Sequence, residues 1–576
     1  MDSNYWTRRR LSRRSMLRGA SIGAAGLGGA ILIGCGDSDG DDDDGDGDGG
    51  GGGGTATAEA TSTSTETGAM APQRGGKLVL HMGTEPRSLD PHFETFTPAP
   101  SNATSNNLVR FTPDLATIVP DAADLPEQPD DLTYIFKLKD GIHMHDVDPL
   151  NGRPLTSEDV KYTIERQTNQ AGDETGVYQH AYYFKDRISK IETPDDQTIV
   201  FTTNAPYAPF MNYMASPWSP IIAREYVEAN GDLTGYVGSS GPYILREWQK
   251  EVRMTFDRNP NYWKNADLPW VDELEFLVSP DVDTSATQFI DGAFHAYVAG
   301  QSQLERVQNA RGDDTDYSAV PSQFWRQFRM SPTDAEWGYL DYAGTDNDAG
   351  RHFDDIRVRQ AICQAIDKQQ VLDLVYSGDG QIAYGPILSQ FTNWALTEEL
   401  VPFDLGEAQK LMAAAGVGEL RGPMMWASSS PQADQVAEII KENLAEIGVL
   451  TDLNPMETAA YYNVTYAYRY TFSHHVPLNS PEPDENLSSY FGANATYFKH
   501  YNPEIFDLVK KQAETVDFEE RKAIVKEAQE KIVLDYPIRF MYTTNIHQFR
   551  SNQLHDFEFS LDRYDAYGVE TAWLDA

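Results

Sequence analysis

The adjacent pair His474 and His475 is the first candidate for metal chemistry, because imidazole is the commonest nitrogen ligand of metal ions in proteins. Neighbouring side chains on a strand point to opposite faces, so the two rings cannot easily share one ion. His143 and His145 are spaced to share a face. We expect neither pair to hold a metal and expect no cofactor. His474 and His475 should instead hydrogen-bond a ligand or pack in the core.

Motifs for hydrolysis are missing or have the wrong spacing. No histidine is followed by glutamate, so the zinc-protease motif H-E-x-x-H does not occur. The "GSSG" stretch at 238–241 lacks the G-x-S-x-G spacing of a nucleophile elbow. The sequence therefore favours a binding protein over an enzyme, with a secreted hydrolase as the alternative.

Cys35 ends an apolar N-terminal segment and is the candidate for lipid attachment. The stretch "LSRRSMLRGA", from residue 11, has the spacing of a twin-arginine export signal. The apolar run that follows, 19–34, has 16 residues, too few to span about 30 Å of hydrocarbon comfortably. The tetrapeptide "LIGC" resembles a bacterial lipobox. We expect residues 1–34 to be a signal peptide and Cys35 to carry lipid, with an ordinary signal peptide as the alternative.

Residues 35–74 have a composition that does not favour folding. The run 36–54 contains eight Asp and ten Gly, so it cannot bury enough apolar surface to offset the entropy of ordering. Matches to G-x-G-x-x-G and to an EF-hand in this run lack the flanking elements or the closing glutamate that those sites need. We expect a flexible tether with a reach of about 35 Å, and a folded domain that begins near Gly75.

The chain is strongly acidic. Its formal net charge is −42, and removal of residues 1–34, with six Arg and one Asp, leaves −47. Such a surface repels nucleic acid and anionic lipid, so we expect no nucleic-acid partner and membrane contact through the lipid alone. The roughly 500 residues after the tether can form two or three domains. Cys363 lies among apolar residues at helical spacing, which predicts a buried structural thiol.

The elements that must position these residues are both strands and helices. The stretches "GKLVLHMG" and "LTYIFKLKDGI" predict strands. A helix is predicted for 156–167, capped by Thr156 or Ser157, and amphipathic helices for 405–415 and 435–447. Pro503 after Asn502 predicts another helix start, because proline at the first helical position costs no hydrogen bond. The class is mixed α/β.

Four stretches, in order, resemble the motifs of one family. "GGKLVLHMGTEPRSLDP" pairs a strand with an "LDP" turn, and "FKLKDGIHMHDVDPLNGRPLTSEDVKYTIER" follows the family pattern with a short insertion. "GSSGPYILREWQKEVRMTFDRNPNYW" and "FDDIRVRQAICQAID" match later segments. From Gly75 the chain therefore resembles the peptide and nickel type (family 5) of extracellular solute-binding proteins, the receptor components of ABC importers. We expect most of these motif residues, His143 and His145 included, to be scaffold.

The resemblance implies an α/β fold of two lobes, periplasmic-binding-protein-like and of type II, with a hinge, an interlobe cleft and an extra subdomain. Lobe one would take 75–315 and 546–576, with the subdomain near 111–190, and lobe two would take 316–545. A solute in the cleft would be enclosed by hinge closure. The implied protein is a monomer at the periplasmic or extracellular face, whose partners are a small solute, an ABC permease and ATPase subunits.

One loop of lobe two departs from the family pattern. Peptide-binding members resemble one another in W-x-x-D-x-x-D-P, whose first Asp neutralises the peptide amine. The corresponding stretch is "FSHHVPLNSPEPDENL". If Glu482 and Pro483 stand for D-P, Asn479 replaces the amine-binding Asp. A buried ammonium without an ionic partner costs about 3–5 kcal/mol, so we predict that a free peptide amine is not held in the usual manner unless Glu482 or Asp484 supplies the charge.

The resemblance implies an oligopeptide or peptide-like solute. A different solute, such as an oligosaccharide or a metal chelate, and a sensor role are the alternatives. We expect ligand contacts from both lobes, with core or strand-edge roles as the alternative for each residue. These residues are Glu85 after the first strand, Arg326 and Phe328 on the first strand of lobe two, His474, His475 and Asn479.

Overall fold

The computed structural model describes residues 71–575 except 94–98, 172–177, 179, 237–238, 332, 335–337, 340–351, 429 and 561–567. The expected signal peptide, the lipid on Cys35 and most of the tether lie outside the described residues. Among the residues described, no helix is both long enough and apolar enough to cross a membrane.

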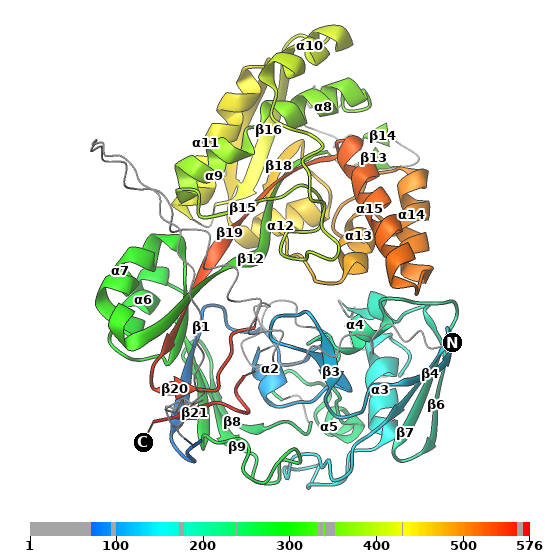
Figure 1. The fold of residues 1–576 in the computed structure, drawn as a ribbon, viewed down its shortest axis with the longest axis vertical. Coiled ribbons are helices and arrows are strands. Elements are labelled where there is room, and N and C mark those ends of the chain that lie inside the picture. Colours follow the sequence, from blue (N-terminus) through cyan, green and yellow to red (C-terminus); the bar gives the residue numbers. More distant parts are fainter. Residues whose placement is uncertain are drawn as a thin grey trace, which may run out of the picture. The chain divides into compact units, whose positions relative to one another are not determined.

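Most strands belong to one eleven-stranded sheet, shown in Figure 1. Its order is β17 (Val449–Met456), β16 (Leu420–Ala427), β18 (Phe472–His475), β12 (Thr315–Met330), β19 (Ile538–Ser551), β11 (Ala296–Ala299), β1 (Lys77–Met82), β10 (Glu273–Val278), β9 (Arg253–Arg258) and β8 (Tyr243–Gln249), with β15 (Gly380–Ile382) paired to β19. Three short pairs lie outside it: β2 (Val109–Phe111) with β3 (Ile118–Pro120), β13 (Thr333–Asp334) with β14 (Gly338–Tyr339), and β20 (Leu554–His555) with β21 (Trp573–Leu574).

The helices pack around the large sheet and beside a smaller, four-stranded sheet. In chain order they are α2 (Ala99–Ala103), α3 (Ser157–Gln167), η2 (Ala181–Tyr183), α4 (Phe210–Met214), α5 (Arg224–Asn230), α6 (Val282–Ile290), α7 (Gln301–Arg311), η3 (Gly312–Asp314), α8 (Ile356–Ala365), α9 (Lys368–Tyr376), α10 (Leu405–Ala415), α11 (Pro431–Ala445), α12 (Thr458–Tyr466), α13 (Pro483–Phe491), α14 (Pro503–Glu514) and α15 (Phe518–Leu534). In Figure 1, α9 and α11 lie to the left of β16 and β18, and α13 to α15 lie to their right.

Buried apolar side chains form two large cores. The first core draws on residues from Leu78 to Ala296 and again on Leu554 to Ala572. The second core draws on residues from Trp325 to Tyr542. Because each core is closed by its own helices and strands, the molecule has two bodies that share one sheet.

Two long strands join the cores. β12 has 16 residues and β19 has 14, and they pair antiparallel from Thr315 with Ser551 to Arg329 with Ile538. The pairing is irregular between Pro321 and Trp325, where the strands leave one body and enter the other. Bulges bend a strand locally, so this segment is where the chain can flex between the two bodies.

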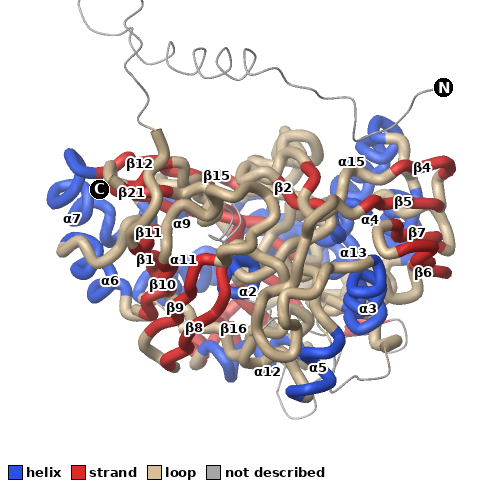
Figure 2. Tube along the Cα trace, turned by 90° about the horizontal axis from the view of Figure 1, so that it is seen from below, coloured by secondary structure: helices blue, strands red, loops and turns tan. Residues whose placement is uncertain are grey.

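A separate four-stranded sheet lies beside the first core. Its order is β4 (Glu127–Asp130), β5 (Thr133–Lys137), β7 (Thr198–Thr203) and β6 (Ile188–Asp195), and α3 packs on it. Figure 2 shows this sheet at the opposite end of the molecule from α6 and α7. It is built from 127–203, which overlaps the segment 111–190 for which the family resemblance implies a subdomain.

Most predicted elements are confirmed. The two predicted strands form β1 and β5, and the helix at 156–167 is α3, capped by Thr156. The helix predicted for 435–447 begins earlier, because Ser430 caps α11 and Pro431 takes the first helical position. Gly241, a glycine of the third motif, has no room for a side chain because another backbone segment passes close to it. A Cβ there would lie 2.3 Å from backbone atoms of Thr104 and Ser105.

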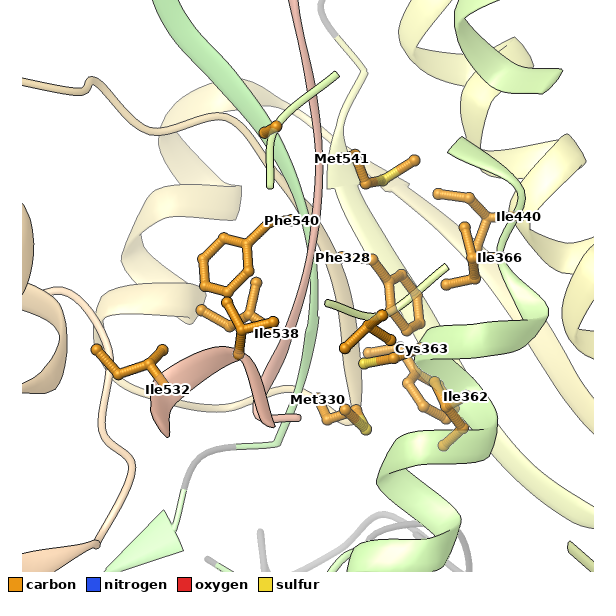
Figure 3. Packing of buried hydrophobic residues seen from close by; sticks show 14 of the residues in the cluster. Phe328, Met330, Ile362, Cys363, Ile366, Ile440, Ile532, Ile538, Phe540 and Met541 are labelled. Atoms are coloured by element: carbon orange, nitrogen blue, oxygen red, sulfur yellow. The ribbon is translucent and has the colours of Figure 1, made fainter. Parts of the chain in front are cut away.

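The second core has two faces, one on each side of β12 and β19. Figure 3 shows Phe328 and Met330 on the face that meets α8, with Ile362, Cys363 and Ile366, and shows Ile538 and Phe540 on the other face. Cys363 is 2% exposed, and burial raises the pKa of its thiol to about 12. The predicted buried structural thiol is therefore confirmed.

Candidate functional site

Three acids gather at the N-terminus of α13, in the loop where the sequence departs from the family pattern. Glu482 caps the helix by accepting a hydrogen bond from the Asp484 amide, and Pro483 takes the first helical position. Asp484 and Glu485 follow in the first turn. Negative charge at a helix N-terminus interacts favourably with the helix dipole, so the local sequence explains this cluster.

This helix end contacts the body that contains the four-stranded sheet. The Tyr213 hydroxyl donates to Asp484 Oδ2 at 2.9 Å, and the hydroxyls of Tyr182 and Tyr183 donate to Glu485 Oε1 at 3.3 and 3.2 Å. Figure 1 shows α4, which carries Tyr213, next to α13 and α14. The two bodies therefore meet through tyrosine hydroxyls and carboxylates as well as through β12 and β19.

The three acids differ in their partners. Glu482 forms an ion pair with Arg521 of α15, and both side chains are 2% exposed. Asp484 accepts hydrogen bonds from Ser488 at 2.5 Å and from Gln512 at 2.6 Å. Glu485 has hydroxyl partners and forms no ion pair with a described residue, and burial raises its pKa. Glu482 and Asp484, the predicted substitutes for the amine-binding Asp, are thus already bonded within the fold.

A group of tyrosines surrounds His475. The Tyr461 hydroxyl lies 2.7 Å from His475 Nδ1, and the rings of Tyr462 and Tyr466 lie 5.7 and 6.5 Å from the imidazole. Tyr466 in turn contacts Tyr497 at 5.8 Å. Burial, and then the Arg329 guanidinium, lower the pKa of His475 well below its usual value, so the ring is neutral. Such amphipathic rings suit the recognition of a small organic solute.

Arg329 supplies a fixed positive charge behind these tyrosines. It is fully buried, donates to Gln327 Oε1 at 2.7 Å and to the Tyr497 carbonyl at 3.2 Å, and lies over the rings of Tyr490 and Phe498. Cation–π contacts and carbonyl bonds hold the guanidinium in place.

The structure brings Arg326 and His474 to one face of the sheet. Arg326 is half-buried on β12, and its guanidinium lowers the pKa of His474 to about 3, after the larger effect of burial. Phe328 lies on the same strand but is fully buried against Phe472 at 5.5 Å. Phe328, predicted as a ligand contact with a core role as the alternative, therefore packs in the core of the second body.

Asn479 is fully buried and ties two loops together. Its Oδ1 accepts from the Leu388 amide at 3.2 Å, and its Nδ2 donates to the Pro386 carbonyl at 2.8 Å. Both ends of the amide are therefore used inside the fold. An aspartate could accept from Leu388 but could not donate to Pro386, which gives a local reason for asparagine here.

Glu85 lies apart from the other predicted residues, beside the β8–β9 hairpin. Its Oε1 accepts from Trp248 Nε1 at 2.6 Å, and both its oxygens accept from the Glu251 amide at 3.1 Å. These bonds give Glu85 partners within the first body.

Metal ligands do not gather in the described part of the chain, where no three His, Cys, Asp or Glu side chains are close enough to hold an ion. His143 bonds the Gly141 carbonyl at 3.0 Å, while His145 bonds the Gly241 carbonyl at 2.9 Å and contacts the Tyr236 hydroxyl. Each of these histidines thus has a local partner in the scaffold.

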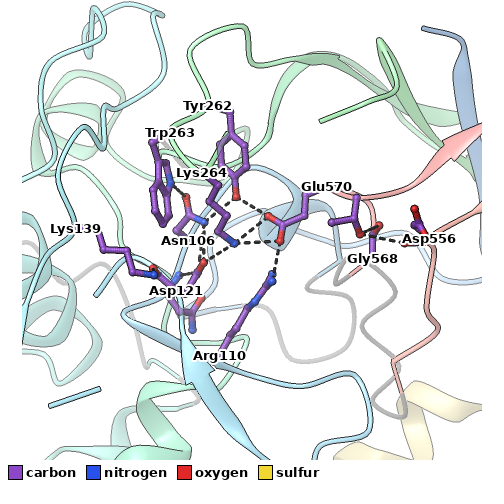
Figure 4. Close-up of polar contacts among 12 residues, drawn as sticks. Asn106, Arg110, Asp121, Lys139, Tyr262, Trp263, Lys264, Asp556, Gly568 and Glu570 are labelled. Atoms are coloured by element: carbon purple, nitrogen blue, oxygen red, sulfur yellow. Dashed lines mark hydrogen bonds and ion pairs between the residues drawn. The ribbon is translucent and has the colours of Figure 1, made fainter. Parts of the chain in front are cut away.

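A second polar cluster, in the first body, is compensated internally. Figure 4 shows Glu570 between Arg110, Lys264 and Tyr262, with Asp121 beside Lys264. The two cations lower the pKa of Glu570 to about 2 against the opposing effect of burial. Because opposite charges face each other, the cluster is suited to fix the C-terminal segment rather than to bind a charged ligand.

Sequence reasoning missed the tyrosines and Glu485. The runs "AYYF" from Ala181 and "YYNVTYAYRY" from Tyr461 are unusually rich in tyrosine, and aromatic residues are enriched at binding surfaces. That density was a usable signal. The pairing of Tyr213 with Asp484, 271 residues apart, left no trace that a single sequence could reveal.

Comparison with known proteins identifies the family. Residues 117–498 match the protein family described as "Bacterial extracellular solute-binding proteins, family 5 Middle". It is 28% identical over 500 residues to di/tripeptide-binding protein 3 of Pseudomonas aeruginosa, covering 81% of this chain and 88% of the relative. It is 25% identical over 463 residues to heme-binding protein A of Haemophilus influenzae, covering 75% and 80% of the two chains.

Solved structures agree on the fold. The oligopeptide-binding protein AppA of Bacillus subtilis, solved in complex with a nonapeptide, superposes with a TM-score of 0.72 at 19% identity, covering 88% of this chain and all (100%) of that chain. The two-lobed α/β fold expected from the sequence is thereby confirmed, and its two bodies correspond to the two cores joined by β12 and β19. On the family match and this shared architecture, the chain belongs to the family 5 bacterial extracellular solute-binding proteins.

Proposed function

We propose that the protein is the substrate-binding receptor of an ABC importer and that it captures an oligopeptide or peptide-like solute outside the membrane. The relatives named for di- and tripeptides support this proposal, and the heme-binding relative supports a non-peptide solute as the second candidate. The receptor acts as a carrier without catalysis, and it works as a monomer with a permease and ATPase subunits.

The contact between Tyr213 and Asp484, together with the strands β12 and β19, carries the mechanism. The paired strands can bend at their irregular segment, and the tyrosine–carboxylate bonds join the bodies on the far side of that hinge. Closure would enclose a solute between the bodies and bring these groups into contact. The permease would then distinguish the closed form from the open one by its shape.

The proposal includes export by the twin-arginine signal and a lipid anchor on Cys35, with residues 35–74 as the tether and lobes at 75–315 plus 546–576 and at 316–545. It rests on the motifs in the sequence. Replacement of Cys35 by Ser should release the exported protein from the membrane fraction. Lipid-labelled protein that persists in the Cys35→Ser variant would contradict the anchor.

Binding and uptake test the function itself. The purified chain should bind members of a tripeptide pool in calorimetry or thermal-shift assays, and a strain lacking the gene should lose uptake of the bound peptides. Binding without loss of uptake would favour a sensor. Conversion of the peptides during incubation would indicate a hydrolase and contradict the proposal.

A further inference from the structure

Arg326 of β12 carries a charge that the fold does not compensate. It forms no ion pair with any described residue, and its Nη1 is buried with no hydrogen-bond partner. Two buried arginines of the same body are paired, Arg359 with Asp535 at 2.7 Å and Arg539 with Glu399 at 3.6 Å. A buried donor without an acceptor is costly, so the unpartnered Nη1 of this cation indicates an absent acceptor, and an anion is the acceptor that suits a guanidinium.

One further polar atom beside Arg326 has no hydrogen-bond partner among the described residues, Nε2 of His474, which is 3% exposed. The hydroxyl of Tyr542, which is fully buried, interacts with Tyr376 of α9, and a hydroxyl can both donate and accept. Tyr542 is the direct cross-strand neighbour of Arg326 on β19, and His474 is the neighbour of Phe328 on β18. Side chains two residues apart on a strand share a face, so the three groups come from adjacent strands on one face.

Their position in the sheet is one where ligands bind. β16 runs parallel to both β17 and β18, and His474 lies at the carboxyl end of β18. In open α/β sheets, ligands bind outside the carboxyl ends of the strands. Arg326 is only half-buried, so a solute can reach it from this edge.

We propose that Arg326, His474 and Tyr542 form a subsite for a carboxylate of the solute. A guanidinium can bind both oxygens of a carboxylate in parallel. The tyrosine hydroxyl and the neutral imidazole can each donate a further hydrogen bond. The proposal rests on the function proposed above and adds to it that the transported solute is acidic at this end.

Two features favour a carboxylate in this place. His474 is neutral, so Arg326 is the positive charge of the group, which suits one negative charge better than a phosphate dianion. Arg329 also lacks a carboxylate among the described residues and also has one unpartnered nitrogen, Nη2, but it is fully buried, and two hydrogen bonds and two aromatic rings enclose it. Arg326 has no such enclosure, so it is the arginine available to a ligand.

The test compares three tripeptide pools made from uncharged residues. The first has free C-terminal carboxylates, the second is C-terminally amidated, and the third is amidated with one glutamate. Each is titrated against the full chain and against Arg326→Gln, Arg326→Lys and Arg357→Gln. Arg357 is a matched control, because it is 47% exposed and paired with Asp355 on the surface of the same body.

We expect Arg326→Gln to lower the affinity for each carboxylate-bearing pool about 10- to 100-fold, the range for a charged hydrogen bond. The affinity for the uncharged pool should change less than threefold. Arg326→Lys should lose less affinity for the carboxylate-bearing pools than Arg326→Gln does. If the wild-type chain prefers the first pool, the subsite binds the C-terminal carboxylate. If it prefers the third pool, the subsite binds a side-chain carboxylate. The unliganded Arg326→Gln protein should unfold no more easily than the wild type.

Equal weakening of charged and uncharged pools would show a structural role and overturn the subsite, while the function stood. If the wild-type chain bound no pool, the peptide function would fail separately. The subsite would then be judged on the solute that copurifies. The subsite is supported if an acidic solute copurifies with the wild type but not with Arg326→Gln. It is contradicted if the copurifying solute has no anionic group.

Discussion

The Tyr213 hydroxyl and the Asp484 carboxylate form a 2.9 Å hydrogen bond between segments 271 residues apart. Tyr213 belongs to α4, beside the four-stranded sheet, and Asp484 to the first turn of α13. Burial, and then the nearby Asp484 charge, raise the pKa of Tyr213 well above its usual value, so the hydroxyl keeps the proton that it donates. The bond joins the two bodies without a charge on the tyrosine side.

Removing this contact should favour the open form. Tyr213→Phe combined with Tyr182→Phe deletes two hydroxyl donors to carboxylates, and hydrogen bonds to charged groups contribute about 1.5–3 kcal/mol each. We expect at least a tenfold faster release of bound solute and a larger radius of gyration in X-ray scattering. Tyr501→Phe, at a residue 48% exposed, is the control. An unchanged release rate in the double variant would show that these hydroxyls do not hold the closed form.

The buried pair of Arg521 and Glu482 should be essential for stability. Both side chains are 2% exposed, and Arg521→Met would leave a carboxylate buried without its cation. Breaking such a pair costs about 3–5 kcal/mol, which chemical denaturation can measure. The double variant Arg521→Met/Glu482→Gln removes the orphaned charge and should recover most of the loss. A double variant as unstable as the single one would mean that packing, not charge, explains the effect.

Asn479 offers a test of the altered amine-binding loop. Asn479→Asp introduces the aspartate that the W-x-x-D-x-x-D-P pattern would have here if Glu482 and Pro483 stand for D-P, but it places a carboxylate against the Pro386 carbonyl and removes a donor. We expect a loss of about 1–3 kcal/mol in stability and no gain in affinity for peptides with a free amine. N-acetylation of a bound peptide should change wild-type affinity less than tenfold. A large loss on acetylation, or a gain in Asn479→Asp, would contradict this account.

The sequence predicted local structure well because caps and periodicity are local. Asn502 caps α14, and 405–415 forms α10, as predicted. The helical spacing around Cys363 extends over two helices, because Asp367 caps α9 two residues after α8 ends. Of the predicted ligand residues, Arg326 and His474 come together. Asn479 and Glu85 have partners set by loops far away in the chain, which a periodic pattern cannot reveal.

Buried histidines should make the protein acid-sensitive. Burial lowers the pKa of His145 to about 4 and that of His474 to about 3, whereas an unfolded histidine titrates near 6.5. The unfolded chain therefore binds more protons below pH 6.5, and stability falls as pH decreases from about 6.5 to 4. Each histidine contributes about 1.4 kcal/mol per pH unit.

His145→Gln measures one such contribution. Its stability should fall less steeply between pH 6 and pH 4 than that of the wild type, by about 1.4 kcal/mol per unit, whatever its stability at neutral pH. Urea unfolding across this range provides the measurement. Parallel pH profiles for the two proteins would mean that His145 is not buried in its neutral form.

Native mass spectrometry of the purified full chain tests the central claim most directly. A solute-binding receptor that closes over its ligand should retain a small solute through gentle purification, visible as a defined mass excess that disappears on denaturation. We predict that the released molecule is a peptide or a peptide-like compound with a carboxylate. A protein that carries no solute, binds no tripeptide pool and hydrolyses peptides on incubation would contradict the account.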